Sequence, residues 1–173
     1  MSEFIKLAHE RYSCRNLTDR PVEKEKIDLI IEAGVCAPTA ANRQPFRIFV
    51  AESEEAVSKV KSYCGQPFIQ PAPVVFIIGA DPETAWVRRI DDKNFADVDA
   101  SIVATQMMLE IQDLGLATTW IGHFECDKIK EAFPEMNGYC LIAMFAVGYP
   151  AEDAQASPMH EKSKPEAELV VRY

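Results

Sequence analysis

A continuous apolar run at residues 73–80, Pro-Val-Val-Phe-Ile-Ile-Gly-Ala, most constrains how this chain can fold. The run is far shorter than the ~18 apolar residues of a membrane-spanning helix. It also lacks the alternation of polar and apolar residues that a half-exposed strand shows, so it predicts a strand buried on both faces. Such a strand must lie inside a sheet that other elements cover on each side.

The rest of the chain supplies those covering elements, because helical and strand-like patterns alternate along it. Helices are predicted at residues 4–11, 22–36, from 53 onward, at 97–114 and at 127–133. Strands are predicted at residues 46–51, 73–80, 118–121, 139–147 and 169–171. With 173 residues and no internal repeat, the chain fits one domain over residues 1–173. The expected class is a sheet with flanking helices, either α/β or α+β.

The last predicted strand, residues 169–171, follows a polar, proline-containing arm at residues 151–166. An arm of that length could carry the strand to another subunit, where it would extend that subunit's sheet and favour an obligate dimer. The alternative is a strand at the edge of the chain's own sheet. Spacing alone supports both arrangements equally.

The charge and the composition argue against several classes of function. The net charge of −9 argues against nucleic acid and against an anionic membrane surface as partners. The five cysteines are scattered without a CxxC pair, and the three histidines form no His-x-x-x-His pair, so neither a disulfide framework nor a metal site is expected. The first residues lack a signal-peptide pattern, which predicts a cytoplasmic protein.

Against this acidic background, the segment Arg11-Tyr12-Ser13-Cys14-Arg15 places two guanidiniums and a hydroxyl within five residues. Arginine offers planar, multidentate donors that match phosphate oxygens, and serine adds a neutral donor between them. Taken alone, the segment fits a solvated turn better than it fits an anion site.

A second segment, residues 37–45, joins the second predicted helix to the first predicted strand with small, polar and proline residues. Its Asn42 and Gln44 side chains can each donate and accept hydrogen bonds, so either could contact an imide-like edge. Residues 38–41 are small enough to let a flat ring approach the backbone. A tight loop whose amides satisfy backbone groups is an equally good explanation.

Other candidates carry less weight. Gly122 would let a ligand approach the backbone closely, whereas His123 is more simply a solvated or structural side chain. Lys162 and Lys164 could contact a phosphate or form an ordinary surface run. Four acidic residues are predicted to form the solvated face of the long helix: Asp97, Asp99, Glu110 and Asp113. No glycine-rich phosphate motif follows a strand, so side-chain cations would have to hold a nucleotide phosphate.

Five segments in order resemble the nitroreductase family of FMN-dependent oxidoreductases over nearly the whole chain. They are RYSCR at 11–15, APTAANRQPFRIFV at 37–50, DASIVATQMMLEIQDLGLATTWIG at 99–122, AVGYP at 146–150 and KSKP at 162–165. The resemblance implies an α+β fold with a central, mostly antiparallel sheet flanked by helices. It also implies an interleaved homodimer with C-terminal strand exchange and two FMN molecules in the interface.

The resemblance further implies how the phosphate end of FMN would be held. Arg11, Ser13 and Arg15 would contact the phosphate and the ribityl chain, with Arg15 nearest the flavin. Lys162 or Lys164 would close over the phosphate. Arginine is frequent in the family where these two lysines stand, so the bidentate grip is weaker here.

The ring of FMN would be held by other residues. Asn42, with Gln44 as a second candidate, would contact the pyrimidine edge of the chain's own flavin. Ile121 and Gly122 would lie beside the reactive N5. Three small residues would line the flavin bound mainly by the other subunit: Pro38, Thr39 and Ala40.

The function implied is a ping-pong cycle in which NADH or NADPH delivers hydride to the flavin and an acceptor then takes the electrons. Nitroaromatics, quinones or similar flat electrophiles would be the acceptors. The flavin carries the chemistry, so no catalytic side chain is assigned.

Phe46 stands where the family often has Trp, and only the short segment 81–93 stands where larger relatives carry a covering insertion. The alternatives are a reductive dehalogenase-like or flavin-fragmenting relative, or a flavin-binding or storage protein without turnover.

Overall fold

The computed structural model describes residues 1–173, and its centre is a four-stranded sheet in the order β1-β2-β6-β5. The strands are β1 (Phe46–Ala51), β2 (Val74–Ala80), β6 (Cys140–Val147) and β5 (Trp120–Ile121). Every neighbouring pair is antiparallel. The apolar run at 73–80 therefore forms an inner strand, and every residue of β2 is buried, as its composition predicts.

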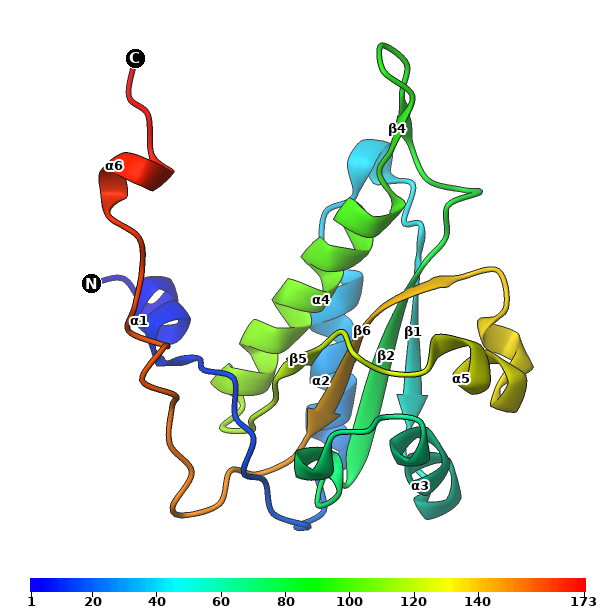
Figure 1. The fold of residues 1–173 in the computed structure, drawn as a ribbon, viewed down its shortest axis with the longest axis vertical. Coiled ribbons are helices and arrows are strands. Elements are labelled where there is room, and N and C mark those ends of the chain that lie inside the picture. Colours follow the sequence, from blue (N-terminus) through cyan, green and yellow to red (C-terminus); the bar gives the residue numbers. More distant parts are fainter.

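Helices cover both faces of this sheet (Figure 1). Two of them, α2 (Lys24–Val35) and α4 (Ala96–Asp113), pack with Phe76 and Ile78 of β2 in one core. The other face carries α3 (Glu54–Ser62) and α5 (Cys126–Ala132), and successive residues of β2 alternate between the two cores. Short 3-10 turns complete the chain at Ala40–Asn42, Pro67–Ile69 and Pro134–Met136.

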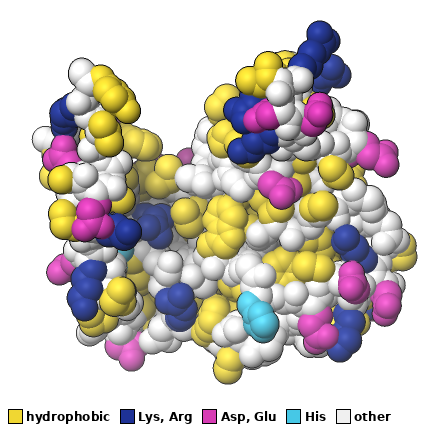
Figure 2. Space-filling view, turned by 45° about the horizontal axis from the view of Figure 1, so that its top comes forward, with side chains coloured by type: hydrophobic (Ala, Val, Ile, Leu, Met, Phe, Trp, Pro, Cys, Tyr) yellow, Lys and Arg dark blue, Asp and Glu magenta, His cyan; other side chains and the backbone are white.

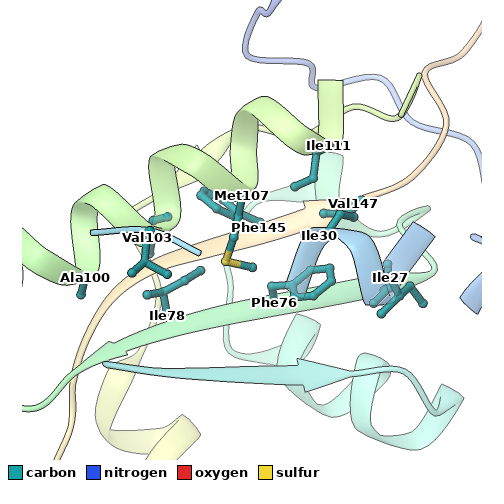
Figure 3. Packing of buried hydrophobic residues seen from close by; sticks show 14 of the residues in the cluster. Ile27, Ile30, Phe76, Ile78, Ala100, Val103, Met107, Ile111, Phe145 and Val147 are labelled. Atoms are coloured by element: carbon teal, nitrogen blue, oxygen red, sulfur yellow. The ribbon is translucent and has the colours of Figure 1, made fainter. Parts of the chain in front are cut away.

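The long helix α4 has a regular apolar face toward β2 and β6. Ala100, Val103, Met107 and Ile111 recur every three or four residues and point at the sheet (Figure 3). The helix ends where Gly115 adopts φ +71°, a conformation that glycine takes at little cost. The helix therefore runs without interruption along the sheet, and residues of the candidate site lie near each of its two ends.

Two segments project from this body. The first is a hairpin of β3 (Val87–Arg88) and β4 (Lys93–Asn94), which extends beyond the start of α4 (Figure 1). The second consists of the two chain ends, where α1 (Glu3–Glu10) and the C-terminal arm lie side by side. No helix has both the length and the apolar character that crossing a membrane requires.

The strand predicted at 169–171 does not form in this chain. Residues Glu166–Leu169 form a single helical turn, α6, and residues 170–173 belong to no helix or strand. The arm runs past α1 and away from the sheet, so no strand edge of its own chain is within reach (Figure 1). Val171 is consequently 72% exposed. Placement of this segment at the edge of its own sheet is therefore ruled out for the single chain.

Candidate functional site

The arginine segment, residues 11–15, leaves α1 as extended chain. Because side chains of extended backbone alternate in direction, Arg11, Ser13 and Arg15 turn to one side while Cys14 is buried on the other. The Cys14 N–H donates to the Thr118 carbonyl oxygen at 3.0 Å. That bond fixes the arginine segment beside the chain that leads from α4 into β5.

The three predicted phosphate contacts line one pocket of about 470 Å³. Its other wall is the C-terminal arm, which contributes Ser157, Met159 and His160. The Nε2 of His160 lies 2.9 Å from the His9 carbonyl oxygen, which attaches the arm to the end of α1. The structure thus brings two distant parts of the chain together around the arginines.

Both arginines in this pocket carry uncompensated charge. Seven ion pairs form in the chain, and none of them includes Arg11 or Arg15. The Arg15 guanidinium lies 5.8 Å from the centre of the Phe68 ring, a contact that orients it without neutralising it. In a protein of net charge −9, a free pair of guanidiniums favours an anionic ligand.

Neighbouring groups leave that positive charge intact. Burial, together with a hydrogen bond to Cys14, raises the pKa of Tyr12 to about 12, so its phenol stays uncharged at neutral pH. Lys162 and Lys164 follow on the arm but do not line the pocket, and Lys164 pairs with Glu168 at 3.6 Å. The predicted lysine contacts therefore lie near the pocket without reaching into it.

Open space adjoins Gly122 at the end of β5. Ile121 is buried, whereas Gly122 is exposed, and a Cβ on Gly122 would meet no atom within 4 Å. The Cys14–Thr118 hydrogen bond holds the arginine segment next to the residues that lead into this strand. The phosphate half-site is the name kept for the pocket residues Arg11, Ser13 and Arg15, taken together with Ile121 and Gly122, which follow Thr118 in the chain.

The loop half-site consists of residues 38–44 and has an unusual backbone. Ala41, Asn42 and Gln44 all have φ between 50° and 52°, a region that non-glycine residues enter only at an energetic cost. The Gln44 N–H donates to Thr39 Oγ1 at 3.0 Å, and Gln44 Nε2 donates to Asn42 Oδ1 at 2.9 Å. Asn42 and Gln44, which are predicted to contact the pyrimidine edge of a flavin, are thus exposed, and their side chains are hydrogen-bonded to each other.

The two half-sites lie at opposite ends of α4 (Figure 1). The Ala40 N–H bonds to Asp99 in the first turn of the helix, whereas the arginine segment bonds to Thr118, beyond its last turn. An α-helix of 18 residues is about 27 Å long. Asn42 was expected to contact its own chain's flavin, and the loop half-site lies the length of this helix away from the arginines of the same chain.

Asp99 is a site residue that the sequence pattern misses. It was expected on the solvated face of α4, but it is 1% exposed and its Oδ1 accepts the Ala40 N–H at 3.0 Å. The spacing of the apolar residues could have indicated that Asp99 is buried. Asp99 lies three residues after Ala96 and four before Val103, within the apolar stripe of the helix. Asp97 and Asp113 are exposed as predicted.

Comparison with known proteins identifies the fold and the family. The sequence model of the nitroreductase family matches residues 8–66 and 59–149. The chain belongs to the nitroreductase family. Its predicted α+β fold is confirmed, because a nitroreductase family protein from Clostridium difficile 630 superposes with a TM-score of 0.88 at 36% identity, covering 98% of both chains.

Two further relatives connect this nitroreductase family member with flavin. The FMN reductase [NAD(P)H] of Bacillus subtilis is 32% identical over 181 residues, which cover 91% of this chain and 70% of the relative. A protein from Desulfovibrio desulfuricans, solved in complex with FMN, shares the fold with a TM-score of 0.80 at 23% identity, over 100% of this chain and 98% of its own. The predicted cofactors are FMN and NAD(P)H: both appear in the name of the Bacillus subtilis relative, and FMN is bound in the Desulfovibrio protein.

Proposed function

We propose that this nitroreductase family member is an FMN-dependent oxidoreductase that takes electrons from NADH or NADPH. It passes them to nitroaromatics, quinones or similar flat electrophiles in a ping-pong cycle. The observation that carries the proposal is the phosphate half-site, where two unpaired guanidiniums and a hydroxyl face one pocket. This donor set suits a phosphate, and the open space at Gly122 would leave room for a ring.

The residues of the half-site fit the phosphate end of FMN in charge and in donor type. Arg11 and Arg15 supply multidentate donors for the phosphate, and Ser13 supplies a neutral donor for the phosphate or the ribityl chain. The exposed backbone at Gly122 leaves one side of a ring accessible. FMN, once bound, supplies the hydride and electron transfer. The protein's task is to hold the ring and to leave that side open to the donor and the acceptor in turn.

The complete site requires two chains in this proposal. The loop half-site of one chain would lie over the phosphate half-site of its partner, since the two half-sites of a single chain are separated by the length of α4. A groove of about 1140 Å³ between α1 and α4 supports a second copy as the occupant. Phe4 and Ile102 on its walls are exposed apolar side chains, 61% and 38% accessible.

The space-filling view shows the surface that a partner would cover. A hollow separates the two chain ends, α1 and the C-terminal arm, from the rest of the molecule, and hydrophobic side chains line part of the hollow (Figure 2). The exposed apolar residues at 169–171 belong to the C-terminal arm. We propose that this segment pairs with the free edge of β1 in the partner, because β1 has a neighbour on one side only.

The test is a visible spectrum of the purified protein, followed by steady-state oxidation of NADH and NADPH with a nitroaromatic or a quinone. We expect a bound flavin spectrum, bleaching by at least one nicotinamide, and sustained turnover when the acceptor is added. A protein that stays colourless after FMN is added would overturn the proposal. Bleaching without turnover would instead identify a flavin-binding protein that does not catalyse the cycle.

A further inference from the structure

Asp99 combines two features found in no other acidic residue of the chain. It is the only buried charged side chain, and its Oδ2 is the only buried side-chain oxygen or nitrogen without a hydrogen-bond partner. An unpaired oxygen on a buried carboxylate lowers the stability of a fold. An apolar residue at this place in the stripe of α4 would avoid that cost, so core packing alone does not account for Asp99.

The other oxygen of Asp99 has a definite partner. Oδ1 accepts the Ala40 N–H at 3.0 Å, across 59 residues of sequence. All other hydrogen bonds of residues 39–44 remain within residues 39–46: Asn42 N–H to Thr39 O, Arg43 N–H to Ala40 O, Gln44 N–H to Thr39 Oγ1, Gln44 Nε2 to Asn42 Oδ1 and Phe46 N–H to Gln44 O. Asp99 is thus the one hydrogen-bond partner that ties this stretch to another element.

This stretch needs such a tie because its backbone is strained. Ala41, Asn42 and Gln44 adopt positive φ without being glycine, and residues of this kind keep that conformation only when their surroundings enforce it. If the tie is lost, the loop relaxes to other conformations. The side chains of Asn42 and Gln44 would then lose their present direction.

We propose that Asp99 is a positioning residue for the cofactor site. Its carboxylate holds Ala40 and thereby keeps residues 39–44 in the conformation that presents Asn42 and Gln44 to FMN. The inference deepens the proposed function and rests on it for the ligand. The positioning itself is a property of the protein without FMN, so the two can be tested separately.

The experiment compares Asp99→Leu, which removes the acceptor, with Asp99→Asn, which retains an oxygen for Ala40. The FMN dissociation constant and the hydrogen exchange of the 39–44 amides without FMN are both measured. For Asp99→Leu we expect about tenfold weaker FMN binding and about tenfold faster exchange, because one charged hydrogen bond no longer favours the competent loop. Asp99→Asn should stay within about threefold of the parent in both measurements.

Adding Ala41→Gly to Asp99→Leu supplies the decisive control. Glycine adopts positive φ without strain, so the double variant should recover FMN affinity to within about threefold of the parent although no contact is restored. Val103→Ala provides a matched loss of core packing, since Val103 lies one turn further on α4 and points at the sheet (Figure 3). It should leave both measurements unchanged.

Three results would overturn the inference. They are unchanged exchange of the loop amides in Asp99→Leu, equal losses in Asp99→Leu and Val103→Ala, and no recovery with Ala41→Gly. If the parent protein binds no FMN, the proposed function fails. The exchange measurement still decides whether Asp99 holds the loop.

Discussion

In the proposed site, Arg11 and Arg15 are the groups that would bind an anion in a strongly acidic protein. The overall field repels a phosphate, so local donors must provide the attraction. Both guanidiniums reach one pocket because extended backbone places alternate residues on the same side. Their role could be proposed from the sequence, since residue types and a spacing of two are visible there. That no acidic side chain neutralises them becomes visible only in the structure.

The first prediction concerns these two charges. Replacing both Arg11 and Arg15 with Ala should weaken FMN binding by about a hundredfold or more, since charged hydrogen bonds to the phosphate contribute about 1.5–3 kcal/mol each. Fluorescence titration with FMN measures the change. The control is Lys24→Ala, which removes an exposed cation from the start of α2 and should leave the affinity unchanged. Full FMN occupancy in the double variant would place the phosphate elsewhere.

At the scale of elements, helices and strands follow the apolar pattern closely, and the predicted ranges of α1, α2, β1, β2, α4 and β6 agree with the structure to within two residues. The pattern works because each of these elements buries one face or both faces in its own chain. It fails at 169–171, where a strand-like composition has no edge to pair with. The pattern also fails at Asp99. An acidic residue is ordinarily assigned to the solvated face of a helix, even where its position falls within the apolar stripe.

The contact between α2 and α4 yields the second prediction. A Cβ on Gly34 would lie 2.8 Å from Met107 Cγ on α4 and 2.9 Å from Ile48 Cδ1 on β1, so α2 packs too closely against both elements for a larger residue. Gly34→Ala should lower the free energy of unfolding by about 1–3 kcal/mol. Urea denaturation measures the change. Gly65→Ala is the control, because a Cβ there meets nothing within 4 Å; equal losses in both variants would contradict the packing argument.

The third prediction concerns Glu110 in the last turn of α4. Burial first, and then the charges of Asp113 and Glu32, raise its pKa above the usual value of 4.5. The folded state therefore binds this proton more tightly than the unfolded state, and ionised Glu110 destabilises the protein at neutral pH. That cost is absent below the unfolded pKa, grows as the pH rises through the folded pKa, and stays constant above it.

Glu110→Gln should consequently stabilise the protein at pH 7 by about 0.5 kcal/mol, in the range of one like-charge pair on a helix. The gain should vanish as the pH falls below 4.5, the usual pKa of this carboxyl group. Thermal unfolding at a series of pH values measures both features. Asp97→Asn is the control. It should not stabilise the protein, because an acidic side chain in the first turn of a helix is favourable. A gain for Glu110→Gln that did not depend on pH would contradict this explanation.

For the whole molecule, the sequence could indicate the family and lead to the proposal of a two-chain assembly, but not to a choice of which half-site would serve which flavin. That assignment depends on the length of α4, which separates residues 38–44 from the arginine segment in one chain. Asn42 was expected beside its own chain's flavin because the order of residues in a sequence gives no distance along a helix. The exposed groove along α4 and the exposed apolar C-terminal segment are consistent with a partner that covers them.

A mixed dimer tests this shared site most directly. One chain carries Arg11→Ala and Arg15→Ala, and the other carries Asn42→Ala and Gln44→Ala, with different affinity tags so that only the mixed dimer is purified. Each variant alone should bind little or no FMN. In the mixed dimer, the intact arginines of one chain meet the intact loop of the other, so one of the two sites is complete.

The measurement is the amount of FMN bound per dimer, obtained from the visible spectrum. A site built from two chains predicts about one FMN for each mixed dimer, with half of the parent turnover. A site built within one chain leaves both sites damaged, and a mixed dimer without FMN would contradict the account.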